Sequence, residues 1–102
     1  MENAQIKEHE MKYRIIPSRA FLNQYPTLSQ KSKELLNKKI EVLEYIPFRN
    51  KQLIGKNIFR IRFKDENKEK RLIYQIGNNQ VFLVTILNRK HDYKDLKKYG
   101  LD

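Results

Sequence analysis

The chain has 102 residues, a net charge of +10 at pH 7 and no cysteine. This length allows one hydrophobic core and therefore a single domain, and the lack of cysteine excludes disulfides and thiolate metal sites. The excess of Lys and Arg favours an anionic partner, with nucleic acid first and a membrane surface or an acidic protein as alternatives. A solvated basic surface without a ligand is the other interpretation.

The sequence also indicates whether the chain carries a flexible tail, a targeting or membrane segment, or a histidine-based metal site. Residues 1–10 are polar and aperiodic, so we expect a flexible tail, and we assign residues 11–102 to the single domain. No apolar run predicts a signal peptide, and no segment approaches the roughly 18 apolar residues of a membrane span. We expect a cytoplasmic protein without cofactors. The spacing of His9 and His91, the two histidines, predicts no metal site.

The N-terminal third predicts a strand followed by a short helix. Residues 11–18 are rich in β-branched and alternating residues and end beside Pro17, which favours a short strand. Residues 18–26 can form about two helical turns before Pro26 stops them.

Residues 27–47 predict the clearest helix. Thr27 and Gln30 have the spacing of a capping box at its start, and Pro47 would end it. Apolar residues recur at helical spacing and predict its buried side. They are Leu28, Leu35, Leu36, Ile40, Leu43 and Ile46. Because few residues separate the two helices, we expect an antiparallel hairpin.

Three strand patterns follow. Residues 57–63 alternate, with Ile58, Arg60 and Arg62 on one face. The charged residues 64–69 are interpreted as a turn, and residues 70–76 and 80–87 as two further strands around an Asn-rich hairpin turn. The last strand is apolar on both faces, as in the interior of a sheet. Residues 88–102 allow a short C-terminal helix.

These elements predict an α+β fold. An N-terminal strand and an α-helical hairpin would pack on a small antiparallel β-sheet of about four strands. The opposite sheet face would remain partly open, with Arg60, Arg62 and Arg71 projecting from it. Arginine forks bind phosphate through two hydrogen bonds and remain charged at any relevant pH. The same alternation could equally be the ordinary solvent-exposed side of a strand.

Taken in order, these motifs resemble the RelE/ParE toxin superfamily. The resemblance covers residues 13–93 and rests on "PSRAFLNQYP" with the helix after it, then "LIGKNIFRIRF", "RLIYQI" and the closing "NRKHDY". It implies the α+β fold described above. For the RelE branch it implies the toxin of a type II toxin–antitoxin system. Such a toxin is a ribosome-dependent endoribonuclease that cleaves mRNA in the A site without a metal.

The resemblance also assigns roles to residues. The catalytic set that it implies is Arg62, Arg71, Arg89, Tyr93 and His91. Further basic residues would bind the RNA: Lys56, Arg60, Lys64 and Lys90. The expected partners are mRNA on the ribosome and an antitoxin with an acidic or amphipathic segment. Two alternatives remain: a ParE-type toxin that poisons DNA gyrase without nuclease activity, and a nucleic-acid-binding protein of the same fold without catalysis.

Overall fold

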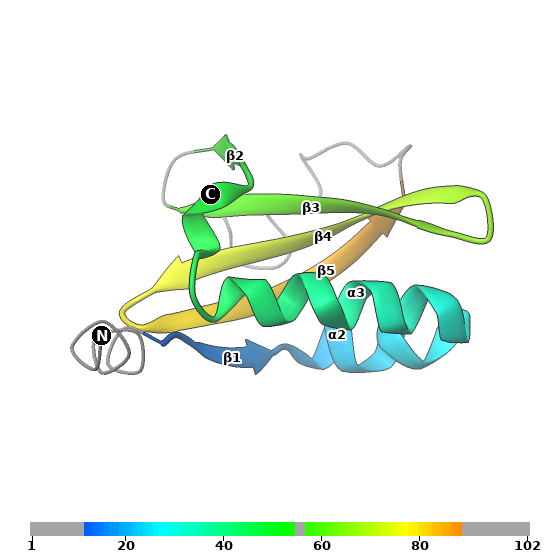
Figure 1. The fold of residues 1–102 in the computed structure, drawn as a ribbon, viewed down its shortest axis with the longest axis horizontal. Coiled ribbons are helices and arrows are strands. Elements are labelled where there is room, and N and C mark those ends of the chain that lie inside the picture. Colours follow the sequence, from blue (N-terminus) through cyan, green and yellow to red (C-terminus); the bar gives the residue numbers. More distant parts are fainter. Residues whose placement is uncertain (1–11, 55–56, 89–102) are drawn as a thin grey trace, which may run out of the picture.

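The computed structural model describes residues 12–54 and 57–88, which fold into two helices and a sheet (Figure 1). The helices are α2 (Arg19–Gln24) and α3 (Gln30–Leu43), followed by the short 3-10 helices η1 (Tyr25–Thr27) and η2 (Pro47–Arg49), respectively. The strands are β1 (Arg14–Pro17), β2 (Lys51–Ile54), β3 (Ile58–Asp65), β4 (Lys68–Gly77) and β5 (Gln80–Asn88). The α+β class is confirmed. The expected C-terminal helix lies outside the described residues.

The strands form one mixed sheet in the order β1-β5-β4-β3-β2. As predicted, β3, β4 and β5 are antiparallel neighbours in chain order, and the apolar β5 is an interior strand. The prediction of about four antiparallel strands was wrong, because β2 adds to β3 as a fifth strand and β1 runs parallel to β5. The alternation of β2 is too short to be recognised, since this edge strand has four residues and begins with exposed Lys51 and Gln52.

A tight turn joins β3 to β4. Glu66 and Asn67 have φ values of 51° and 72°, as in the type I′ turn whose twist matches that of a β-hairpin. The interpretation of residues 64–69 as one long turn was wrong, because Asp65 and Lys68 are already register partners in the two strands. Charged residues continue the strand here since this end of the hairpin is partly exposed.

Helix α3 begins later than the capping-box pattern indicates. Its N-cap is Ser29, whose hydroxyl accepts a hydrogen bond from the backbone N–H of Ser32 at 3.2 Å. Thr27 instead lies in η1, where its hydroxyl donates to the Gln24 carbonyl at 2.6 Å. The proline-containing η1 turn therefore takes up the residues that the pattern assigned to the cap. The helix also ends at Leu43, well before Pro47.

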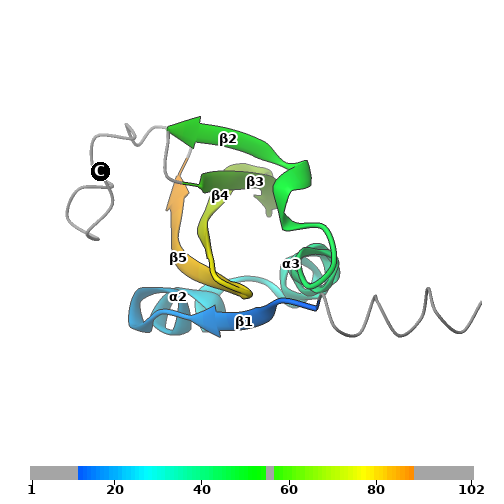
Figure 2. The same cartoon turned by 90° about the vertical axis from the view of Figure 1, so that its left-hand side faces the viewer.

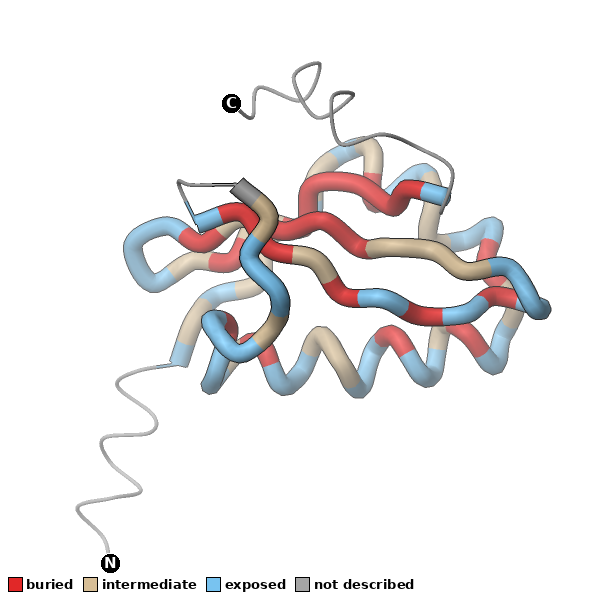
Figure 3. Tube along the Cα trace, turned by 90° about the horizontal axis from the view of Figure 1, so that it is seen from above, coloured by how far each residue is buried: buried red, intermediate tan, exposed pale blue. Residues whose placement is uncertain are grey.

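The main core lies between α3 and one face of the curved sheet (Figure 2), and buried residues are concentrated along the strands (Figure 3). Leu28, Leu36 and Leu43 are buried as predicted, whereas Leu35 and Ile46 are 42% and 45% exposed. The described helices include none long and apolar enough to span a membrane.

Tyr74 stands at the centre of this core with no exposed surface. Its ring stacks on Phe59 with centroids 5.5 Å apart. Its hydroxyl donates to the Pro47 carbonyl at 2.6 Å and accepts from the Asn50 side-chain amide at 3.0 Å. Burial raises the pKa of Tyr74 to about 12. The hydroxyl therefore ties η2 and Asn50, the residue before β2, to β4.

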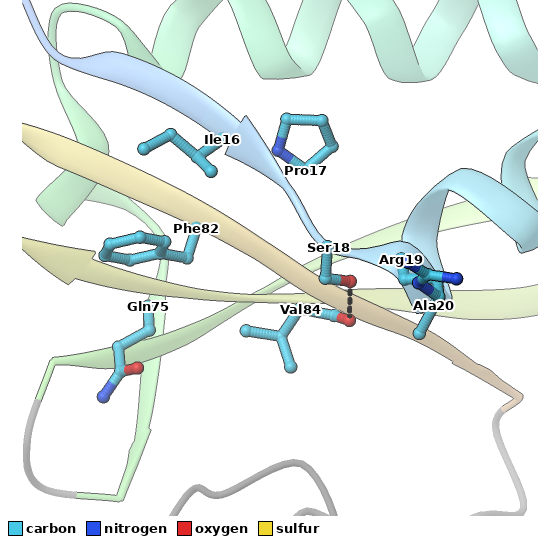
Figure 4. A pocket seen from close by; sticks show the side chains of 8 residues that line it. All are labelled: Ile16, Pro17, Ser18, Arg19, Ala20, Gln75, Phe82 and Val84. Carbon is cyan, nitrogen blue, oxygen red and sulfur yellow. Dashed lines mark hydrogen bonds between the residues drawn. The ribbon is translucent and has the colours of Figure 1, made fainter.

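Side chains from α2 continue the sheet where β1 ends. The Ser18 hydroxyl donates to the Val84 carbonyl at 2.6 Å (Figure 4). At the last residue of α2, the Gln24 amide accepts from the Ile86 N–H at 2.7 Å and donates to the Ile86 carbonyl at 3.1 Å. A glutamine side chain thus forms the pair of hydrogen bonds that a neighbouring strand would form. It protects the part of β5 that extends beyond its pairing with β1.

Candidate functional site

The candidate site lies on the second face of the sheet, opposite α3. Alternation along β3 and β4 places Arg60 and Arg62 on the same face as Arg71. Arg62 and Arg71 are direct register partners, so their Cα atoms are about 4.5–5.5 Å apart. The prediction that these three arginines share one sheet face is confirmed by the strand register.

The second face is partly open, as expected, because apolar side chains cover the rest of it. Ile58, Ile73, Val84 and Leu87 form a buried apolar cluster on it, with Leu53 and Phe82 packed against them. The charged part is restricted to the end nearest the β3–β4 turn. The alternation of residues 57–63 already places Ile58 on this face, but the apolar partners that bury it come from β4 and β5 and depend on the register between strands.

Glu69 lies between the two arginines and was missed as a site residue. One of its carboxylate oxygens, Oε2, is 3.7 Å from Nη1 of Arg62 and 4.0 Å from Nη2 of Arg71. The Arg62 side chain is 61% exposed, whereas that of Arg71 is 16% exposed. Extending the alternation of β4 backwards by two residues from Arg71 would have placed Glu69 on this face. The prediction of a turn over residues 64–69 excluded Glu69 from the strand and therefore from this face.

A shallow hollow marks the charged end. It has a volume of about 290 Å³ and is lined by Arg62, Phe63, Lys64 and Glu69. A separate hollow of about 410 Å³ lies where β1 meets α2 and includes Ser18, Phe82 and Val84 (Figure 4). The first is lined by two cations and one carboxylate, and the lining of the second includes one charged side chain, that of Arg19.

The hairpin that carries these arginines is fastened to the start of α3. The Asp65 carboxylate accepts a hydrogen bond from the backbone N–H of Ser29 at 3.0 Å, and the Ser32 hydroxyl donates to the Lys64 carbonyl at 3.1 Å. The Ser29 backbone bond, followed by the Ser32 hydroxyl, lowers the pKa of Asp65 below its usual value. These bonds hold the tip of the hairpin, and so the charged end of the second face, in a fixed position.

The remaining predicted site residues are outside the described residues: Lys56, Arg89, Lys90, His91 and Tyr93. Their convergence with Arg62 and Arg71 stays a prediction. Within residues 12–54 and 57–88, His, Asp and Glu side chains form no group of three or more that could hold a metal ion.

The sequence matches no protein-family model and no curated protein significantly, but solved structures do resemble it. A double arginine-to-alanine mutant of the E. coli toxin RelE, in the free state, aligns with a TM-score of 0.74 and 21% identity over 88% of this chain and 99% of that one. A chain of the intact E. coli RelBE toxin–antitoxin complex aligns with a TM-score of 0.68 and 20% identity, over 78% of this chain and 99% of that one. The isolated E. coli RelE toxin aligns with a TM-score of 0.63 and 24% identity, over 87% of this chain and 99% of that one. The chain therefore has a RelE-like fold, as its motifs predict.

Proposed function

We propose that this protein is the toxin of a type II toxin–antitoxin system and that it cleaves mRNA in the ribosomal A site. The observation that carries the proposal is the pairing of Arg62 with Arg71 on the second face of a RelE-like sheet. Two cations held by adjacent strands suit a phosphodiester, which carries one negative charge and gains another on attack.

The chemistry requires no metal. The RNA 2′-oxygen attacks the adjacent phosphorus, the bond to the 5′-oxygen breaks, and the products are a 2′,3′-cyclic phosphate and a 5′-hydroxyl. In this proposal Arg71 and Arg89 clamp the phosphate, and Arg62 neutralises the leaving oxygen. Tyr93 stacks on a base or assists proton transfer, and His91 is a second acid–base group because imidazole titrates near neutrality.

The basic residues around this centre would hold the RNA backbone. Arg60 and Lys64 lie on the same strand as Arg62, and Lys56 and Lys90 complete the proposed set. Contacts of this kind to phosphate are sequence-independent and weaken with salt.

The proposed partner is an antitoxin with an acidic, amphipathic segment. One of the similar structures is a toxin–antitoxin complex. Helix α3 exposes Leu35 and Val42, which are 42% and 41% accessible and seven residues apart, with exposed Lys31 and Lys38 along the same stripe. Exposed apolar residues between lysines suit a partner with the complementary pattern.

Primer extension on mRNA after induction of the protein tests the proposal. Cuts in phase with codons, absent when Arg71 is replaced by Ala, are the expected result. Intact mRNA together with DNA breaks and stalled replication would instead favour a gyrase poison of the same fold. Intact mRNA with salt-sensitive RNA binding would leave a binding protein without catalysis.

A further inference from the structure

The inference concerns the carboxylate between the two arginines and rests on the proposed function. We propose that Glu69 is an internal competitor of the RNA: in the free protein its carboxylate oxygen occupies the position that a phosphate oxygen takes between Arg62 and Arg71.

The contact geometry supports an exchange. The same atom, Oε2 of Glu69, faces both guanidinium groups, at 3.7 and 4.0 Å. These distances exceed those of N–H···O hydrogen bonds, so the carboxylate neutralises the arginines without forming short bonds to them. A phosphate oxygen that enters this position can approach more closely and accept charge-assisted hydrogen bonds from the guanidinium forks.

The strand register explains why such a group is needed in the free protein. Like charges directly opposite each other on two strands are destabilising, and Arg62 and Arg71 are opposite each other. Glu69 compensates this pair when no RNA is present.

The register also provides a second position for the displaced carboxylate. Lys64 is the direct cross-strand partner of Glu69, and both line the hollow at the charged end. When a phosphate takes the place between the arginines, the Glu69 side chain can turn to this lysine. After the exchange, the Glu69 carboxylate therefore still has a cation, Lys64, beside it.

The test compares two isosteric variants that each remove one negative charge from the same hairpin. Glu69→Gln removes the competing carboxylate, and Glu66→Gln removes an exposed carboxylate from the turn. The probe is a short fluorescent 2′-O-methyl RNA, which binds through its phosphates but cannot be cleaved by 2′-hydroxyl attack. Anisotropy titrations at low salt should show that Glu69→Gln binds about three- to ten-fold more tightly than Glu66→Gln, because only Glu69 faces both arginines.

A second comparison excludes a general effect of net charge. With Arg62→Ala as the background, Glu69→Gln should increase RNA affinity by clearly less than it does in the original protein. Thermal unfolding of each variant verifies that it is folded.

Three results would overturn the inference: equal affinities of the two Gln variants, weaker binding by Glu69→Gln, or no binding of the RNA by any variant. Because the probe resists cleavage, its result is separate from that of the primer-extension assay. Tighter binding without mRNA cleavage would retain the competitor role of Glu69 and reject the nuclease.

Discussion

Arg62 and Arg71 face each other across β3 and β4 as direct register partners, with one Glu69 oxygen within 4.0 Å of both guanidinium groups. Their spacing is therefore determined by the hydrogen-bonded ladder and not by a loop. Groups built on strands are held more precisely than groups on loops, which favours electrostatic stabilisation of a transition state.

Replacing Arg71 by Lys should not preserve cleavage. Lysine keeps the charge but loses the planar fork, so we expect the cleavage rate to fall to near that of Arg71→Ala, on the order of 10²-fold below the original protein. Single-turnover cleavage of mRNA on programmed ribosomes measures this. Lys68→Ala, which removes an exposed cation of the same hairpin, should cleave at close to the original rate. An Arg71→Lys variant as fast as the original protein would contradict the prediction.

Asp65 should stabilise the fold only in its ionised form. Its pKa is lowered mainly by the hydrogen bond from the Ser29 backbone N–H, so its contribution is present above the unfolded-state pKa near 3.8 and is lost as pH falls through the lower folded-state pKa. Asp65→Asn should lower the free energy of unfolding by about 1 kcal/mol at pH 7.

Denaturant titrations at pH 7 and at low pH measure the Asp65 contribution. The stability difference between the original protein and Asp65→Asn should shrink as pH falls below about 4, the ordinary pKa of an aspartate side chain. Glu66→Gln, one residue further along, should have little effect at either pH. A difference that persists at low pH would contradict the role of the carboxylate.

Tyr74→Phe should destabilise the protein although Phe is nearly isosteric. The change removes the donor to the Pro47 carbonyl and the acceptor of the Asn50 amide, at a cost of about 1–2 kcal/mol. Urea unfolding at pH 7 measures the cost, with the exposed Tyr45→Phe as a control of nearly zero effect. Equal stability of the two variants would contradict the prediction.

The free energy of unfolding at alkaline pH gives a separate test of the role of Tyr74. Its folded-state pKa is raised to about 12, so the unfolded chain loses the proton first and stability falls as pH rises from about 10, the ordinary tyrosine pKa, towards 12. The stability advantage of the original protein over Tyr74→Phe should decrease over this interval. An advantage that stays constant would show that Tyr74 ionises equally in both states.

Gln24 should contribute more than its position on a short, partly exposed helix suggests. Gln24→Ala removes both hydrogen bonds to the Ile86 backbone and should cost about 1–2 kcal/mol. Amide hydrogen exchange at Ile86 should also become faster, because its N–H loses its acceptor. The exposed neighbour Asn23→Ala serves as control, and unchanged exchange at Ile86 would contradict the assignment.

Local periodicity was sufficient for the elements whose signal lies within the element itself. The alternation of β3 places Arg60 and Arg62 on one face, and the apolar character of β5 identifies an interior strand. The parallel direction of β1 could not be derived, because it depends on pairing between Arg14–Pro17 and Gln80–Leu83, which are far apart in the chain.

Local periodicity was also insufficient to place the start of α3 and the turn between β3 and β4. Ser29 replaces Thr27 as the cap because Pro26 lies within a 3-10 turn and Asp65 accepts the Ser29 N–H from another element. Glu69 was missed because two positive-φ residues compress the turn, and this extends β4 into a charged segment. A contact with another element decides the helix boundary, and the backbone conformation of Glu66 and Asn67 decides the turn boundary.

The most direct test of the central claim is mapping of mRNA ends by primer extension in cells that express either the original protein or Arg71→Ala, at matched protein levels. The proposal predicts codon-phased mRNA ends with the original protein and their loss with the variant. Identical end patterns from both proteins, or intact mRNA in cells whose growth the original protein arrests, would contradict it.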